Sequence, residues 1–341
     1  MKLIPIRKYF LYLLPFLFLL LILLFPTQAR NGASNGLLLW FNVLLPTLLP
    51  FMILSDLIRR LHIVDKLCNH ISSRTGRNLY FLYPLLLGLL CGLPLGAKLT
   101  AESVRSGQLS RKQGEFLLTV CNNSSIMFLV GYVAEIQLQR PELIGFFLFF
   151  IPLSSLLAAI LQTAFSTFYA TLSDTLQQPN TIPHAQLPGT HPTVIAHSLK
   201  TLPHRTTVAY SLSPTFTTPS SSFITTVSNS IMDSFTVITQ VGGFVILFSV
   251  LSEFVLLINS PLTLPLVAAL EITIGIRTVC ASTLSPTTMV ILSAAAVSFT
   301  GLSGIAQTAC MLSGTGLSLV RYIISRILSA ILISLLFLLI L

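Results

Sequence analysis

The sequence predicts an all-α polytopic membrane protein, and its composition and long apolar runs are the observations that predict it. Of the 341 residues, 53% are hydrophobic and only 9% are charged, whereas soluble domains carry roughly 25% charged residues. Several apolar runs approach the roughly 20 residues that a helix needs to cross a bilayer. The runs are continuously apolar and do not alternate with polar residues, which argues against a β-barrel.

The net charge of +9 does not indicate nucleic-acid binding. Lys and Arg lie in short patches beside apolar runs, which is typical of membrane topology signals, and no basic face is visible. The five cysteines show no CxxC spacing and fit small packing positions. HExxH, GxSxG and P-loop sequences are absent. We therefore expect neither an enzyme nor a resident cofactor or metal, and no nucleic-acid partner.

The chain divides into two membrane halves after an N-terminal segment. Residues 1–29 have a basic start and an apolar core, which predicts a first span; a signal-like segment is the alternative. Residues 30–170 form the first membrane repeat and 226–341 the second. Between them, residues 171–225 are rich in Pro, Ser and Thr, which predicts a hydrophilic linker.

Within the first half, residues 80–97 predict a re-entrant hairpin. Both flanking segments are rich in Lys and Arg, as cytoplasmic loops are, and two consecutive cytoplasmic loops cannot flank a full span. Gly92, Pro94 and Gly96 fit the tip of such a hairpin, because glycine supplies unusual dihedral angles and proline ends a helix. Non-helical backbone at this depth is tolerated only beside protein or a water-filled cavity. The segment therefore predicts a cavity.

The second half repeats this order of irregularities. The segment 268–279 again has a polar, glycine-bearing centre, and the polar interruption at 298–308 corresponds to the one at 121–131. Three spans and one hairpin in each half make an odd number of crossings, so the two halves are expected to be inverted relative to each other. Inverted repeats with broken helices are typical of secondary transporters. The alternative is that both halves merely contain kinked helices.

Polar side chains at these interruptions are the candidate functional residues. Lys98 is either a cation that attracts an anionic substrate or an interfacial lysine whose ammonium reaches water. Glu271 lies in an apolar segment, where a carboxylate is costly and suggests function; the alternative is an ion pair with Arg277. Broken helices add free N–H groups that suit carboxylates.

Amides and hydroxyls at 121–125 and 300–307 are able to bind a polar ligand within a cavity, and small-residue helix packing is the competing explanation. The complete set of predicted substrate-binding residues is Gly92, Pro94, Gly96, Lys98, Asn122, Asn123, Ser124, Glu271, Thr273, Gly301, Ser303 and Gln307.

These segments carry a family resemblance. "GLLLWFNVLLPTLLPFMILSDLI", "GLPLGAKL", "NNSS", "LEITIG" and "GLSG" resemble the YlbJ-type sporulation integral membrane proteins, which have a nucleoside-recognition Gate domain. The resemblance covers roughly residues 30–340 except the linker. The family's motifs read "GYPxGAK", "NNSGP" and "LEITNG", so Leu93, Ser125, Ile126 and Ile274 depart from them. The resemblance implies a fold similar to concentrative nucleoside transporters and a role in moving dipicolinic acid during sporulation.

Together these observations predict a transporter or permease of a small organic anion, with dipicolinic acid as the candidate cargo. It is expected to work by alternating access in the bacterial cell membrane or a forespore membrane, coupled to a proton or sodium ion, with the lipid bilayer around it. One alternative is a nucleoside-type solute, for which Lys98 matters little. The other is a non-transporting membrane scaffold in spore-envelope assembly.

Overall fold

The fold is helical, as the sequence predicts. The computed structural model describes residues 6–63, 66–68, 70–71, 79–176, 223–258 and 260–340, with side chains from residue 13 onward and, at the end of the first half, up to residue 167. No strand occurs among these residues. Within these described ranges, five helical stretches are long and apolar enough to cross a membrane: Pro26–Arg60, Pro141–Thr167, Phe223–Leu256, Pro286–Met311 and Leu319–Ile340.

The first half begins with a long helical stretch and continues with a hairpin, a broken helix and a long helix. In chain order the elements are α1 (Ile6–Leu24), α2 (Pro26–Leu39), a π-helical turn η1 (Trp40–Leu44), α3 (Leu45–Arg60), α5 (Leu82–Cys91), α6 (Leu95–Arg105), α7 (Arg111–Cys121), a π-helical segment η2 (Phe128–Gln137), a 3₁₀ turn η3 (Pro141–Leu143) and α8 (Ile144–Leu176). The N-terminal helix α1 packs on the second half, where Phe18 meets Phe254 edge-on at 6.2 Å between ring centroids.

The second half has the same order of elements. They are α9 (Phe223–Leu256), α10 (Thr263–Leu270), α11 (Ile272–Cys280), α12 (Pro286–Phe299), α13 (Gly301–Met311) and α14 (Leu319–Ile340). The pair α10–α11 takes the place of α5–α6, the broken helix α12–α13 takes the place of α7–η2, and α14 takes the place of α8. Both flanking helices extend into the predicted linker 171–225, because α8 continues to Leu176 and α9 begins at Phe223. Residues 177–222 of that prediction lie outside the described residues.

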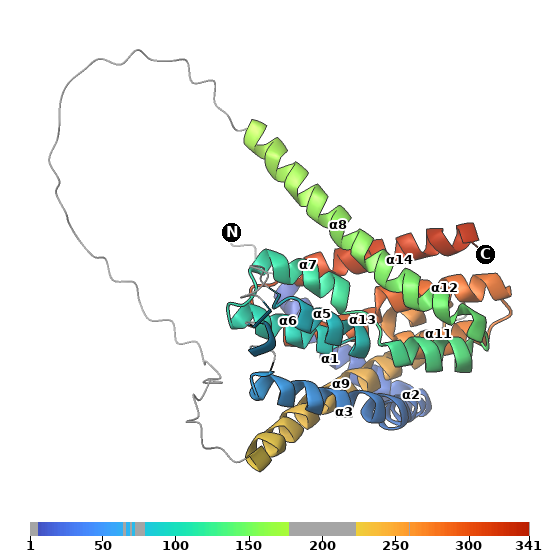
Figure 1. Ribbon diagram of the computed structural model, residues 1–341. Helices are drawn as coiled ribbons and strands as arrows, with labels where there is room; N and C mark the ends of the chain where they lie inside the picture. The colour runs from blue at the N-terminus through green and yellow to red at the C-terminus, as the bar shows by residue number, and fades with distance from the viewer. Residues whose placement is uncertain are drawn as a thin grey trace, which may run out of the picture.

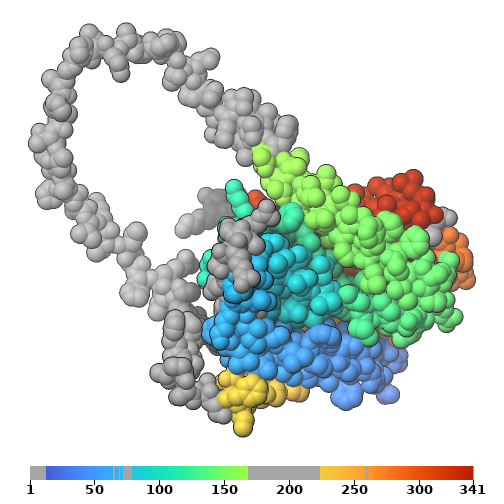
Figure 2. Space-filling view, viewed as in Figure 1, coloured from blue at the N-terminus to red at the C-terminus, as the bar shows by residue number. Residues whose placement is uncertain are grey.

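The hairpins and broken helices lie between two groups of long helices. In Figure 1, α8 and α14 pack on one side, and α2, α3 and α9 pack on the other. Figure 2 shows the blue α2–α3 surface along one edge, the green α8 surface along the opposite edge, and the cyan to teal surface of α5–α7 between them. Large apolar side chains such as Phe149, Phe165 and Leu338 are exposed on the outer helices, as expected for surfaces that face lipid. The polar helix interruptions are thereby kept inside the bundle.

The tip of the first hairpin packs backbone against backbone. Gly92 has φ +72°, and a Cβ there would lie 2.4 Å from the Ser125 nitrogen. The N–H of Leu93 donates to the Asn123 carbonyl at 2.7 Å. A Cβ on Gly96 would lie 2.6 Å from the Cys121 carbonyl oxygen. The break predicted at residues 92–96 is therefore confirmed, and its glycines are required by close approach to the first broken helix.

The second hairpin and the second broken helix are interrupted by different means. Glu271, with extended backbone (φ −143°, ψ 119°), separates α10 from α11, and a Cβ on Gly275 would lie 2.2 Å from the Cα of Ala268. The two arms of this hairpin therefore touch closely. Thr300 (φ 71°) and Gly301 (φ 66°) both adopt left-handed backbone between α12 and α13. This confirms the interruption that the sequence predicts near residue 300.

Candidate functional site

A cavity of about 280 Å³ lies where the helix interruptions of the two halves meet. This volume is near the lower end of small-molecule pockets, which span roughly 300–1,000 Å³, so the cavity suits a small solute. The polar residues that line it are Asn42, Thr47, Ser124, Ser125, Tyr132, Glu271, Thr273, Thr300, Ser303 and Gln307. The apolar lining includes Leu93 and Phe128 from the first half and Val241 and Val245 from α9.

Residues from both interrupted helices supply hydrogen-bonding groups to this cavity. Ser124 is buried, and its Oγ has no hydrogen-bond partner within the part of the chain that the structure describes. From α13, Gln307 donates through Nε2 to Ser303 Oγ at 3.2 Å, so its amide oxygen remains an acceptor. A buried polar atom without a partner is costly. Ser124 therefore gives the cavity a group that a polar ligand would satisfy.

An aromatic pair forms one wall. Phe128 and Tyr132 stack at 5.1 Å between ring centroids with an interplanar angle of 18°, and the Tyr132 hydroxyl donates to the Thr273 carbonyl at 2.8 Å. This bond joins η2 to the second hairpin. The wall therefore offers a flat apolar surface that is held in place by both halves, and such a surface suits a planar ring.

Glu271 is both a helix cap and a cavity residue. Its Oε2 accepts from the Ile274 N–H at 2.8 Å, and its Oε1 accepts from Thr273 Oγ1 at 3.3 Å. The carboxylate therefore caps the N-terminus of α11, where a negative charge is stabilised by the helix dipole. Arg277 acts on this carboxylate electrostatically, and the hydrogen bonds that hold the carboxylate come from Ile274 and Thr273. Of the residues that the structure describes, Glu271 alone brings a charge to the cavity lining.

Asn122 and Asn123 are placed beside the cavity, and neither is among its lining residues. Asn122 Oδ1 accepts from the Ala97 N–H at 3.0 Å, and its Nδ2 donates to Thr308 Oγ1 at 2.9 Å and to the Tyr322 hydroxyl at 2.8 Å. All of its polar side-chain atoms are therefore used within the protein. The amide of Asn122 ties the first hairpin to α13 and α14, which is a structural use that the sequence did not reveal.

Asn123 anchors a buried arginine that was not among the residues predicted from the sequence. Arg326 on α14 is fully buried; its Nη1 donates to Asn123 Oδ1 at 2.5 Å, and its Nη2 donates to the Thr119 carbonyl. Its Cζ lies 5.2 Å from the centroid of the Tyr322 ring. Ser155 also donates to Asn123 Oδ1, at 2.7 Å. The position of Arg326 near a helix start resembles that of an ordinary topology residue, so its burial could not be predicted from the sequence.

Lys98 lies outside the cavity lining. It is half-buried on α6 and interacts electrostatically with Asp56 on α3, whose carboxylate also accepts from Arg59 and Arg60 at 2.6 Å each. This cluster lies where the first hairpin returns to the basic loop. The placement agrees with the interfacial interpretation of Lys98, while direct contact with a substrate stays a prediction.

The structure thus brings together only part of the predicted set. Ser124, Glu271, Thr273, Ser303 and Gln307 line the cavity, while Gly92, Pro94, Gly96, Lys98, Asn122, Asn123 and Gly301 do not. The cavity residues that the sequence analysis did not name as candidates are mainly Asn42, Thr47, Ser125, Phe128, Tyr132 and Thr300. Asn42 and Thr47 are the polar residues within "WFNVLLPTLLP". Their isolation in an apolar stretch is the signal that could have found them.

These features define a multi-pass helical membrane protein with a polar cavity inside the bundle. The chain is 27% identical over 344 aligned residues to the sporulation integral membrane protein YlbJ of Bacillus subtilis (strain 168), an alignment that covers 93% of this chain and 78% of that protein. No family model matches the chain, and no solved structure matches it. The similarity confirms the resemblance to YlbJ-type sporulation integral membrane proteins.

Proposed function

We propose that this protein is a secondary transporter of a small organic solute and works by alternating access. The observation that carries the proposal is the cavity that both hairpin tips and both broken helices line together. Broken helices that meet inside a bundle are where secondary transporters bind their solutes. Within the described residues, Ser124 is the member of the cavity lining whose buried hydroxyl has no partner in the protein, so a bound solute would satisfy it.

We propose further that the two halves are inverted repeats. Two contacts between the halves support this. Arg105 at the end of α6 donates to the carbonyl of Met311, the last residue of α13, at 2.7 Å and to that of Ser313 at 2.8 Å. Beside the central cavity, the Tyr132 hydroxyl of η2 donates to the carbonyl of Thr273 in the second hairpin. Each hairpin is thus joined to the broken helix of the opposite half, as expected if the hairpins enter from opposite sides.

The charge of the cavity bears on the cargo. Among the described residues, its lining contains the carboxylate of Glu271 and no Lys or Arg, and the charge of Arg277 acts on that carboxylate from outside the lining. A dianion such as dipicolinic acid would therefore meet a like charge with no cation in direct contact. A neutral solute with a planar ring and hydrogen-bond donors fits better, because it would stack on Phe128 and Tyr132 and donate to Glu271 and Gln307. We therefore place the nucleoside-type solute first. The organic anion is second and would depend on Lys98.

Transport assays in proteoliposomes test the proposal. The purified full chain is reconstituted, and uptake of labelled nucleosides and of labelled dipicolinic acid is measured with a proton gradient, with a sodium gradient and with none. We expect saturable nucleoside uptake that falls at least tenfold in Glu271→Gln. The matched control is Glu253→Gln, because Glu253 accepts from Asn35 outside the cavity.

The other possible outcomes would favour one of the two alternative functions, the organic-anion transporter or the membrane scaffold. Uptake of dipicolinic acid alone, lost in Lys98→Ala, would overturn the neutral cargo and retain the transporter. Uptake of neither solute by correctly folded protein, combined with specific capture of spore-envelope proteins that survives cavity substitutions, would favour the membrane scaffold.

A further inference from the structure

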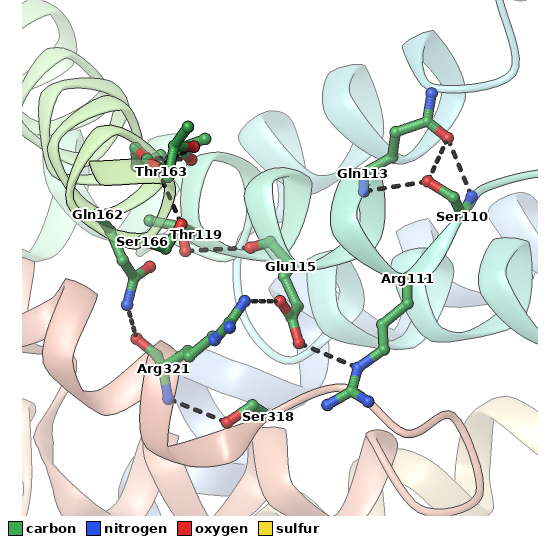
Figure 3. Close-up of polar contacts among 12 residues, drawn as sticks. Ser110, Arg111, Gln113, Glu115, Thr119, Gln162, Thr163, Ser166, Ser318 and Arg321 are labelled. Atoms are coloured by element: carbon green, nitrogen blue, oxygen red, sulfur yellow. Dashed lines mark hydrogen bonds and ion pairs between the residues drawn. The ribbon is translucent and has the colours of Figure 1, made fainter. Parts of the chain in front are cut away.

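A second polar site lies between the ends of α7, α8 and α14 that are predicted to be cytoplasmic. It is a cup of about 350 Å³, lined by Lys112, Glu115, Gln162, Thr163, Ser166 and Arg321 among others. Figure 3 shows Glu115 between Arg111 and Arg321, with Gln162, Thr163 and Ser166 facing them from α8. None of these residues lines the central cavity. The cup therefore needs its own explanation.

The cup carries an excess of positive charge. Glu115 accepts from Arg111 Nε at 3.2 Å and from Arg321 Nη1, and the carbonyl of Arg321 accepts from Gln162 Nε2 at 2.8 Å. Lys112, which also lines the cup, is exposed and forms no ion pair among those found in the described ranges. Two arginines thus pair with one carboxylate, and Lys112 adds a third cation to the cup. The cup is suited to an anion that brings at least one negative charge.

The hydroxyl groups of the cup point to a particular kind of anion. Thr163 Oγ1 donates to the Ala159 carbonyl at 2.7 Å, and Ser166 Oγ donates to the Thr163 carbonyl at 2.9 Å. Their protons are used by α8, so their oxygens face a ligand as acceptors. The cup therefore presents cations for a phosphate and acceptors for hydroxyl donors beside that phosphate.

The cup continues into a large apolar groove along α5, α7 and α8. The groove has a volume of about 770 Å³, and it shares Lys112, Phe116 and Thr163 with the cup. Its other walls include Leu89, Leu153 and Leu156. Thr163 and Leu148 mark its extent along α8, and at 1.5 Å per residue they are about 22 Å apart. That exceeds the roughly 15 Å of hydrocarbon in one leaflet, so a whole acyl chain has room.

We propose that the cup and the groove together bind one anionic phospholipid with a hydroxylated headgroup, of the phosphatidylglycerol type. Lys112 and the free face of Arg321 hold the phosphate, the oxygens of Thr163 and Ser166 accept from the headgroup hydroxyls, and an acyl chain lies along the groove. Basic pockets between membrane helices on the cytoplasmic side bind anionic lipid headgroups in this way. The proposal does not depend on the solute that the central cavity takes.

Native mass spectrometry of the delipidated full chain in detergent tests the site. Phosphatidylglycerol and phosphatidylcholine with identical acyl chains are titrated, and glycerol 3-phosphate serves as the soluble form of the headgroup. We expect phosphatidylglycerol to bind at least tenfold more tightly than either. Lys112→Gln should weaken it about fivefold, the effect of one basic residue near an anionic lipid. Arg30→Gln, which removes an exposed charge elsewhere, should not change it.

A neighbouring pair of substitutions tests the groove. Leu156 lines it, whereas Leu157, also exposed on α8, does not. Leu156→Trp should fill the groove and weaken phosphatidylglycerol binding, while Leu157→Trp should leave it unchanged. Equal binding of both lipids, equal binding of glycerol 3-phosphate, or equal effects of the two tryptophans would overturn the proposal. So would a dimer that forms on delipidation and is lost in Leu156→Trp, because the groove would then hold a second copy. If Leu156→Trp does not fold, the Lys112→Gln variant and the comparison of the two lipids still test the proposed lipid site.

Discussion

The two hairpins occupy equivalent places in their halves, yet they contribute differently to the cavity. The tip of α5–α6 is clamped by backbone contacts, with Gly92 against Ser125 and Leu93 bonded to Asn123. The tip of α10–α11 instead presents the carboxylate of Glu271 to the cavity. The broken helices differ as well: Asn122 and Asn123 bond within the protein beside the cavity-lining Ser124, while Ser303 and Gln307 of the second half both line the cavity. The first half supplies most of the anchoring, each half supplies five of the ten polar lining residues named above, and the second half supplies the carboxylate.

The largest expected effect comes from breaking the clamp of the first hairpin. Gly92→Ala forces a left-handed backbone on an L-residue. It also places the new Cβ against the backbone nitrogen of Ser125, which is not able to move aside as a flexible side chain would. We expect a loss of roughly 2–6 kcal/mol from strain and overpacking. Thermal unfolding followed by the monodispersity of the detergent-solubilised protein measures it. Gly243→Ala, where a Cβ meets nothing within 4 Å, is the control, and equal behaviour of both would refute the clamp.

The second-largest loss of stability is expected from removing an amide that anchors the first half. Asn123→Ala removes the acceptor that Arg326 and Ser155 share and leaves a buried cation short of a partner, which costs about 3–5 kcal/mol. We expect a melting temperature several degrees lower. Gln307→Ala, which removes a cavity amide, should change the melting temperature much less and should reduce solute uptake more than stability. If Gln307→Ala proves as destabilising as Asn123→Ala, the division between anchoring and binding residues is wrong.

Two substitutions of Glu271 distinguish its role as a helix cap from its proposed role in solute binding. Glu271→Ala removes both functions, and loss of the cap should cost about 1 kcal/mol. In Glu271→Gln the amide oxygen still accepts from the Ile274 N–H, so stability should be nearly retained while uptake falls. Parallel measurement of melting temperature and uptake distinguishes the two. Normal uptake in Glu271→Gln would show that Glu271 caps α11 and does not bind the solute.

The smallest effect is expected at Lys98. Because its side chain lies outside the cavity lining, Lys98→Ala should leave uptake of a neutral solute within about twofold, a change of roughly 0.4 kcal/mol. Titration of uptake against solute concentration is the measurement. A tenfold rise in the half-saturating concentration would restore Lys98 as a binding residue.

The sequence predicted the helices and their interruptions better than it predicted the uses of individual side chains. The breaks near Pro94, Glu271 and Thr300 follow from local chemistry, because glycine, proline and polar residues in apolar runs interrupt helices. Whether an amide faces a cavity or another helix depends on tertiary packing. Asn123 and Ser124 are neighbours of similar polarity, yet Asn123 meets Arg326 from a helix about 200 residues away, and no local pattern indicates that contact.

The hydrogen bonds of Asn122 constrain how the molecule is able to move. One amide joins α7 to the first hairpin through Ala97, to α13 through Thr308 and to α14 through Tyr322. Separating these helices would break three buried bonds, each worth about 0.5–1.5 kcal/mol in the folded state and more if its partner stays dry. A conformational state in which these helices had separated would therefore have a low population. A motion that kept these four elements together as one body would leave all three bonds intact.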